Sequence, residues 1–295
     1  MQTKQQVQQL LATAGLSPNK RLGQNFLIDL NLMRLLVETA DIKPIDTILE
    51  VGCGTGSLTE ALAEKAGRLI VAEYDDNLAK ITQGLLANKK NVEIINTDIL
   101  ATKNTINGQV IEKITSAHQQ LAGRFMLVAN LPYSVACPVI LNLVTGPLTA
   151  DAMYVTVQKE VAERMAAKPA SGHYGIISIT LAASGAVKIE RILKPSVFWP
   201  APKVASAMVS YVRDEEKVSK IKDITLFTEI VSHFMGHRRK MLAACTKLTS
   251  PFLSNITNWP QIFAAANIDP TQRPEKISPQ DYVALANACF EKTAN

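Results

Sequence analysis

Four residues in the middle of the chain, Asn130-Leu131-Pro132-Tyr133, carry groups suited to holding a planar ring that bears an amine. They follow an apolar run over 125–129, which predicts a buried strand that ends at Asn130. The Asn130 side chain offers an acceptor oxygen, and Tyr133 offers a flat face. Pro132 biases Leu131 away from helix, which leaves the Leu131 carbonyl as a second acceptor. Adenine suits such a site, although a strand-to-helix turn with a buried tyrosine is the plain alternative.

A glycine-rich turn, Gly52-Cys53-Gly54-Thr55-Gly56, follows another predicted strand over 47–51. Glycine lets the backbone turn tightly and lets a ligand approach it closely. A dinucleotide fingerprint would place its third glycine at position 57, where this chain has Ser. The spacing therefore favours S-adenosylmethionine, which has no pyrophosphate, although such a turn alone is a weak signal.

Two acidic residues follow the next two predicted strands, Glu73 after 69–72 and Asp98 after 92–95. Glu73 lies about as far from the glycine turn as the ribose-binding acid does in nucleotide-binding folds, and Asp98 is placed to accept a hydrogen bond from the cofactor adenine. Each acid alone is more often a solvated loop residue. Ligands of open parallel sheets bind at the carboxyl ends of the strands, so we predict one cofactor site there from Gly52, Gly54, Glu73, Asp98 and Asn130.

Alternating strands and helices in the first part of the chain predict an α/β fold with a parallel sheet covered on both faces. Further strands are expected at 152–157, 186–193 and 204–212, the last two as a closing pair. Helices are expected at 57–66, 78–86 and 159–167, with a helix or buried segment at 176–184. A charged linker over 213–217 then leads to helices at 226–235, 239–248, 259–266 and 279–290. We therefore expect a catalytic domain over 1–213 and a small helical domain over 214–295.

Composition narrows the class of protein. The 295 residues are 47% hydrophobic, yet no apolar stretch reaches the length of a membrane span, and the polar N-terminus lacks the apolar core of a signal peptide. The four cysteines have no CxxC spacing and the four histidines form no cluster. We therefore expect neither a metal site nor a disulfide framework. We expect a cytoplasmic protein.

The net charge of +5 is concentrated in one segment. Residues 187–213 hold five Lys or Arg and one Glu, whereas residues 1–186 are balanced at 16 of each sign. Such a segment is typical of a phosphate-backbone contact or of an ordinary basic surface. Lys20, Arg21 and the run 238–240 add further cations.

Six segments occur in a characteristic order: 20–27, 130–133, 157–164, 198–206, 238–242 and 273–275. Taken in order, these motifs resemble the ribosomal RNA small-subunit adenine N6,N6-dimethyltransferase family, the KsgA type. Two positions depart from the family pattern: Cys53 replaces a usual proline, and Ala205 replaces a common acidic residue.

The resemblance implies a Rossmann-like class I S-adenosylmethionine-dependent methyltransferase domain with a C-terminal helical RNA-recognition domain. The implied reaction is dimethylation of two adjacent adenosines near the 3′ end of 16S rRNA in the 30S particle or its precursor, by a monomer with a role in small-subunit biogenesis. The implied catalytic residues are Asn130, Leu131, Tyr133 and Phe198. The implied cofactor contacts are Asn25, Leu27, Gly52, Glu73, Asp98 and Asn130.

The implied roles give a mechanistic hypothesis. Hydrogen bonds from the target amine to the Asn130 side-chain oxygen and the Leu131 carbonyl would favour a pyramidal nitrogen, without a general base. Tyr133 and Phe198 would hold the extruded base between two rings. The alternative for Phe198 and Trp199 is packing, which we favour for Trp199.

Three other functions stay open. They are a large-subunit rRNA dimethyltransferase of the macrolide-resistance type, a non-catalytic ribosome-assembly factor, and a small-molecule methyltransferase. The N-terminal and C-terminal motifs disfavour the first, and intact Glu73, Asp98, Asn130 and Tyr133 disfavour the second. The adenine motif and the basic segment disfavour the third.

Overall fold

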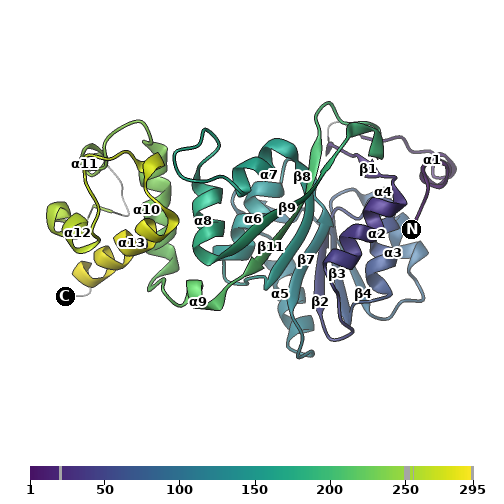
Figure 1. Cartoon of the computed structure of the whole chain (residues 1–295). Coiled ribbons are helices and arrows are strands. Elements are labelled where there is room, and N and C mark those ends of the chain that lie inside the picture. Colours follow the sequence, from purple (N-terminus) through teal and green to yellow (C-terminus); the bar gives the residue numbers. More distant parts are fainter. Residues whose placement is uncertain (20–21, 249–252, 255, 294–295) are drawn as a thin grey trace. The chain divides into compact units, whose positions relative to one another are not determined.

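The computed structural model describes residues 1–19, 22–248, 253–254 and 256–293, and it divides into two compact units (Figure 1). The first unit holds residues 1–162 and 188–212. The second holds residues 163–187 and the described part of 213–295. This division differs from the single boundary expected after residue 213, because Tyr174 and Ile179 pack in the same core as the C-terminal helices.

A seven-stranded sheet organises the first unit. Its neighbouring strands β4, β3, β2, β7 and β8 are parallel, and β11 runs antiparallel to β8. The α/β fold class is therefore confirmed, with a mixed rather than wholly parallel sheet, and the predicted closing strands are neighbours. In spatial order the strands are β4 (Val92–Asn96), β3 (Arg68–Glu73), β2 (Thr47–Val51), β7 (Phe125–Asn130), β8 (Ala152–Gln158), β11 (Ser206–Arg213) and β9 (Gly185–Leu193).

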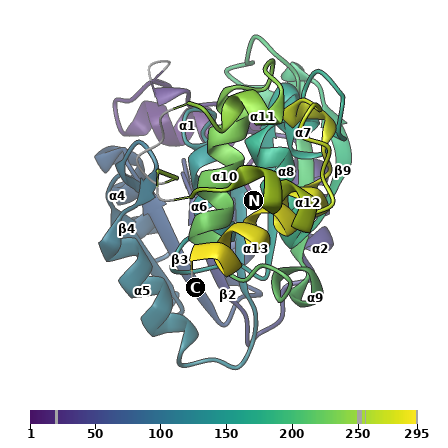
Figure 2. The same ribbon diagram turned by 90° about the vertical axis from the view of Figure 1, so that its left-hand side faces the viewer.

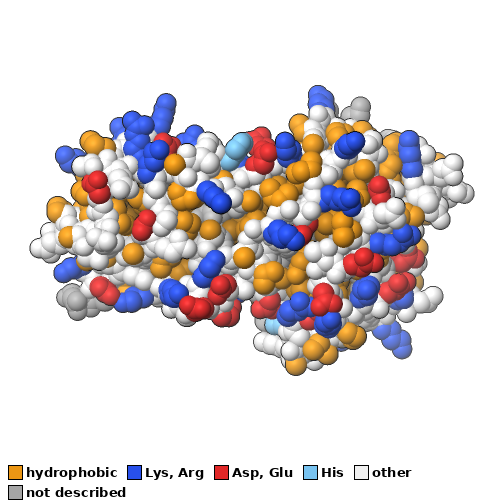
Figure 3. All heavy atoms as spheres, viewed as in Figure 1, with side chains coloured by type: hydrophobic (Ala, Val, Ile, Leu, Met, Phe, Trp, Pro, Cys, Tyr) orange, Lys and Arg blue, Asp and Glu red, His pale blue; other side chains and the backbone are white. Residues whose placement is uncertain are grey.

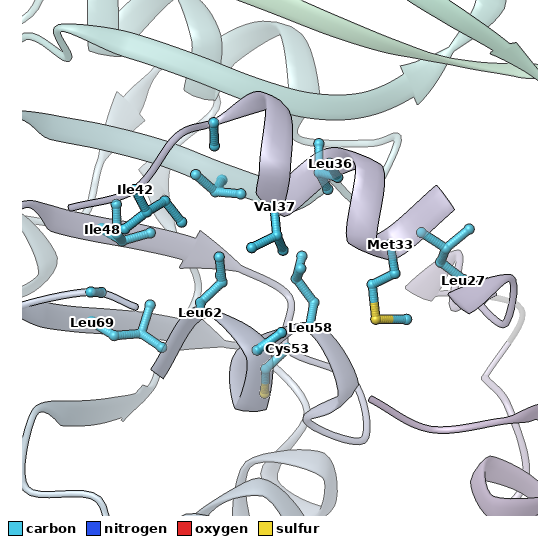
Figure 4. Packing of buried hydrophobic residues seen from close by; sticks show 14 of the residues in the cluster. Leu27, Met33, Leu36, Val37, Ile42, Ile48, Cys53, Leu58, Leu62 and Leu69 are labelled. Carbon is cyan, nitrogen blue, oxygen red and sulfur yellow. The ribbon is translucent and has the colours of Figure 1, made fainter. Parts of the chain in front are cut away.

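The central strands are apolar along their length because helices cover both sides of the sheet. All five residues of β2 are buried. On one side, α2 (Leu30–Thr39) and α3 (Ser57–Ala63) direct Leu36, Val37 and Leu62 into a core that includes Ile48 (Figure 4). Helix α5 (Gly108–His118) packs against β2 and β3 on the opposite side from α2 (Figure 2).

Four helices of this unit, α1 (Lys4–Thr13), α2, α5 and α6 (Ala136–Thr145), were not predicted from the sequence. The short strands β1 and β10 pair antiparallel, so that Phe26 lies opposite Trp199 and Leu27 opposite Phe198. The remaining elements are α1 (Lys4–Thr13), β1 (Phe26–Leu27), α4 (Asp76–Leu85), β5 (Leu100–Thr102), β6 (Thr105–Ile106), α6 (Ala136–Thr145) and β10 (Phe198–Trp199).

The second unit is helical, and Phe227, Phe234 and Tyr282 are fully buried in its core. Helices α10 and α13 lie side by side in both views (Figures 1 and 2). The helix predicted over 239–248 is largely wrong, since only Leu242–Cys245 is helical. The elements are α7 (Lys159–Met165, which begins in the first unit), α8 (Ile176–Ser184), α9 (Glu215–Val218), α10 (Ile224–Gly236), α11 (Leu242–Cys245), α12 (Trp259–Ala265) and α13 (Pro279–Thr293).

The predicted linker over 213–217 is only partly irregular. Strand β11 runs through Arg213, and the Asp214 side chain caps α9 by accepting a hydrogen bond from the Lys217 amide at 3.1 Å. Among the described residues, no helix has the length and apolar character needed to cross a bilayer.

Candidate active site

A cavity of about 320 Å³ lies at the carboxyl ends of β2, β3, β4 and β7, entirely within the first unit. This size is within the range of small-ligand sites. Phe198 is the one predicted site residue that does not line it. The predicted residues that do are Asn25, Leu27, Gly52, Gly54, Glu73, Asp98, Asn130, Leu131 and Tyr133.

The glycine turn forms one wall of the cavity with a left-handed backbone at Gly52 and Gly54, whose φ values are +77° and +58°. A Cβ at Gly52 would lie 3.0 Å from the Pro132 ring, and one at Gly54 would lie 3.0 Å from the Phe26 ring. The turn is thus packed between the 130–133 motif and the N-terminal segment. Only glycine fits both the backbone and the space.

Glu73 lies at the end of β3 with 6% of its surface exposed. Its two carboxylate oxygens accept hydrogen bonds from the amides of Gly54 (3.2 Å) and Asp75 (2.9 Å). The Cys53 thiol lies 3.5 Å from one of these oxygens. Burial raises the pKa of Glu73. The side chain is therefore fixed in the wall, and Oε1, which accepts only the Asp75 bond, keeps a lone pair for a ligand hydroxyl.

Glu50 is a second buried carboxyl in this wall and was not singled out from the sequence. It is 1% exposed, and within the described structure its Oε2 atom has no hydrogen-bond partner. Burial raises the pKa of Glu50 to about 8. A buried unpaired polar atom is costly unless a ligand satisfies it, so Glu50 marks a position for a cationic or donor group. The sequence signal that could have identified Glu50 is an acidic residue inside the apolar run 47–51.

Asp98 is exposed at the end of the loop after β4 and also lines the cavity. Its Oδ1 atom accepts a hydrogen bond from the Leu100 amide at 2.9 Å. The carboxylate is thereby oriented, and its remaining lone pairs can receive a donor such as an exocyclic amine.

The Asn130 carboxamide is held from two sides. Its Nδ2 group donates to the main-chain carbonyl of Asn25 at 3.0 Å, and its Oδ1 atom accepts from the Thr156 hydroxyl. The Leu131 amide donates to the Thr156 carbonyl at 3.2 Å. No described residue donates to the Leu131 carbonyl. The arrangement leaves one lone pair on Oδ1 and the Leu131 carbonyl as acceptors beside the cavity.

The aromatic pair expected around the base is not formed. Tyr133 lines the cavity, and its hydroxyl lies 2.7 Å from the Ser206 hydroxyl. Phe198 is instead 3% exposed and packs in the core opposite Leu27, because β10 pairs with β1. Trp199 packs against Phe26 with ring centroids 6.2 Å apart, in agreement with the packing role predicted for it.

The N-terminal segment supplies the remaining wall. Leu27 is 5% exposed and Asn25 donates through its side chain to the Gly23 carbonyl at 2.9 Å. Both residues line the cavity, as predicted. Lys20 and Arg21, two of the predicted cations, lie outside the described residues.

Four of the five basic side chains of the segment 187–213 are exposed: Lys188, Arg191, Lys194 and Lys203. Lys188 pairs with Glu190 at 2.6 Å, whereas no described carboxylate pairs with Lys194 or Lys203. Figure 3 shows basic side chains at the tip of the connection between β9 and β11. In the second unit, basic side chains gather where α10 ends and α11 begins, the region of the exposed run 238–240 (Figure 3). Within the described chain, no three His, Cys, Asp or Glu residues cluster as metal ligands would.

Comparison with known proteins adds sequence relatives along nearly the whole chain. The sequence profile of the ribosomal RNA adenine dimethylase family matches residues 15–289. The ribosomal RNA small subunit methyltransferase A of Geobacillus kaustophilus is 34% identical over 289 residues, covering 97% of this chain and 96% of that protein. The protein of the same description from Alkaliphilus metalliredigens is 35% identical over 273 residues, covering 90% of each.

Solved structures support the fold. A dimethyladenosine transferase from Plasmodium falciparum superposes with a TM-score of 0.70 at 20% identity, over 90% of this chain and 97% of that one. The 23S rRNA methyltransferase ErmE superposes with a TM-score of 0.61 at 20% identity, over 90% of this chain and 100% of that one. At 20% identity, the two structures support the fold alone.

Proposed function

Because this chain belongs to the ribosomal RNA adenine dimethylase family, we propose that it dimethylates two adjacent adenosines near the 3′ end of 16S rRNA. The chain is an S-adenosylmethionine-dependent rRNA adenine N6-dimethyltransferase. Small-subunit methyltransferases match it over nearly their full length, which favours the small-subunit reaction over the large-subunit alternative. The proposed substrate is the 30S particle or its precursor, and the proposed setting is the cytoplasm, where the protein acts as a monomer.

The cavity fits S-adenosylmethionine because its walls offer acceptors for the cofactor's donors and a glycine cradle that a Cβ would fill. Glu73 is proposed to accept the ribose hydroxyls, and Asp98 the adenine amine. The unpaired Glu50 oxygen is proposed to accept the ammonium group of the methionine moiety. Asn25, Leu27, Gly52 and Gly54 complete the binding surface. The cofactor supplies an electrophilic methyl group on a sulfonium.

The observation that carries the proposal is the Asn130 carboxamide, fixed between Asn25 and Thr156 at the edge of the cavity. The target amine is proposed to donate to Asn130 Oδ1 and to the Leu131 carbonyl. In the first transfer these two bonds engage both amine hydrogens and direct the nitrogen lone pair toward the methyl group. The methylated amine, with one hydrogen left, keeps one of the two bonds in the second transfer. Each transfer leaves a thioether and one proton, which passes to solvent. Catalysis in this scheme comes from positioning and electrostatics, and the scheme needs no general base.

Tyr133 is proposed to provide a stacking face for the extruded base, a contact worth roughly 1–3 kcal/mol. Phe198 is proposed as the second face. To reach the base, its ring must turn out of the core in which it packs. The unpaired Lys194 and Lys203 on the same connection are proposed to contact the RNA backbone.

The experiment that tests this function offers the protein and labelled cofactor to undermodified 30S and 50S particles in parallel. Label in 30S rRNA supports the proposal. Label confined to 50S rRNA would identify the macrolide-resistance type of reaction, and label in neither particle would favour an assembly factor. The Asn130→Ala variant is the negative control, since it lacks the carboxamide that receives the amine.

A further inference from the structure

The N-terminal segment closes one side of the cofactor cavity. Val7 of α1 is 1% exposed and packs with Phe26 and with Leu78 of α4. Val7, Phe26 and Leu78 also line the cavity. Helix α1 is therefore part of the cavity wall. The contacts that hold the N-terminal segment against the glycine turn help to determine the shape of the cavity.

Gln2 makes that anchor through three hydrogen bonds. Its side-chain amide donates to the Thr55 carbonyl at 2.9 Å and accepts from the Thr55 hydroxyl at 2.7 Å. Its main-chain amide donates to the Ser57 hydroxyl at 2.6 Å. Gln2 is 7% exposed and Thr55 is 2% exposed, so water does not readily replace these bonds. The nitrogen and the oxygen of the Gln2 side chain are therefore paired with the carbonyl and the hydroxyl of Thr55.

The glycine turn has one internal main-chain hydrogen bond among the described contacts, from the Gly56 amide to the Cys53 carbonyl at 3.0 Å, and its other polar groups depend on outside partners. Gly54 and Gly56, which flank Thr55, both have a left-handed backbone. Glycines of this kind are free to adopt many conformations, and holding one costs entropy. The Gly54 carbonyl is satisfied by the Thr82 hydroxyl at 3.1 Å, and the Thr55 carbonyl by Gln2. Without Gln2, the buried polar groups of Thr55 lose their partner and favour another turn conformation.

We propose that Gln2 is a positioning residue for the cofactor, which holds the glycine turn in its binding conformation by pairing with both polar groups of Thr55. The role rests on the proposed function, since it concerns the S-adenosylmethionine site. Gln2 does not line the cavity and acts only through the turn.

The test compares Gln2→Met with Gln5→Met. Methionine keeps the length of glutamine and removes its amide, and Gln5 is an exposed glutamine in the first turn of α1, three positions after Gln2. Calorimetry with S-adenosylhomocysteine should give a dissociation constant about tenfold higher for Gln2→Met than for the native protein. The KM for the cofactor should rise in parallel. The kcat at saturating cofactor and the KM for the 30S particle should change less than twofold, and Gln5→Met should match the native protein throughout.

A purely structural role for Gln2 would lower the melting temperature and leave the dissociation constant of the folded protein unchanged, which would overturn the proposal. Thr55→Val provides a second measurement, because it removes only the hydroxyl. Its effect on cofactor affinity should shrink when Gln2→Met is already present. Additive effects would contradict the pairing. Native protein that fails to bind S-adenosylhomocysteine would instead refute the proposed function.

Discussion

The main-chain carbonyl of Asn25 accepts a hydrogen bond of 3.0 Å from the side chain of Asn130, 105 residues further along the chain. The contact joins the N-terminal segment to the end of β7 at the edge of the cavity. It fixes which way the Asn130 carboxamide faces, because the bonded nitrogen turns the oxygen toward Thr156. The wall of the cofactor cavity and the proposed base site are therefore connected by hydrogen bonds through Asn130.

Thr156→Val should lower kcat by roughly fivefold, because a lost hydrogen bond of about 1 kcal/mol releases the Asn130 carboxamide. Cofactor affinity should be unchanged, since Thr156 does not line the cavity. Thr47→Val is the matched control: Thr47 is equally buried on β2, but its hydroxyl has no partner in the described structure. Single-turnover methylation of 30S particles measures the effect. Equal rates for the two variants would contradict the role of Thr156.

Gly52→Ala should abolish measurable cofactor binding. The new Cβ would lie 3.0 Å from the Pro132 ring and would occupy a backbone with φ of +77°. Gly84→Ala is the control, because Gly84 lies in α4 with open space around it. That change should leave binding intact and stabilise the protein by up to about 1 kcal/mol. Calorimetric binding and thermal unfolding distinguish the two, and native-like binding by Gly52→Ala would refute the cradle.

Cofactor binding should strengthen as the pH rises from 6 to 7.5. The pKa of Glu50 is raised to about 8, so the free protein holds this proton throughout that interval. A bound ammonium group favours the ionised carboxylate, so binding releases the proton and tightens by up to about tenfold per pH unit. Calorimetry in buffers of different ionisation enthalpy measures the released proton.

Glu50→Gln is the control for this pH dependence. Burial also raises the pKa of Glu73, and this carboxyl is unchanged in the variant. The part of the pH dependence of cofactor affinity that is lost in Glu50→Gln is therefore due to Glu50. A pH profile identical to that of the native protein would show that Glu50 does not meet the ammonium group.

Tyr133→Phe should retain most activity, because it keeps the ring and loses only the bond to Ser206. Tyr133→Leu should lower kcat/KM for the 30S particle by roughly 5- to 150-fold, the equivalent of 1–3 kcal/mol of stacking. Cofactor affinity should stay within twofold of native in both. Equal activity of the Leu and Phe variants would remove Tyr133 from base recognition.

The ends of β2, β3, β4 and β7 could be predicted from the sequence because each strand is a short apolar run closed by a polar residue or a turn. These strand ends lie at one edge of the sheet because the strands are parallel. The sequence pattern therefore predicts that Gly52, Glu73, Asp98 and Asn130 surround one cavity, as they do.

Other parts depended on contacts between distant segments. Phe198 lies in the core because β10 pairs with β1, and two-residue strands leave no periodic signal. Gln2 sits in a polar, glutamine-rich segment, where nothing distinguishes it from the exposed Gln5. The predicted helix over 239–248 shrank to Leu242–Cys245 because Met241 has an extended backbone, with ψ of 149°.

The most direct test of the account is to map the methyl groups. Undermodified 30S particles are incubated with native protein and cofactor, and the 16S rRNA is digested and analysed by mass spectrometry. The account predicts N6,N6-dimethyladenosine at two adjacent positions near the 3′ end, and none with Asn130→Ala. Methylation elsewhere in the rRNA, or full activity of the Asn130→Ala variant, would contradict it.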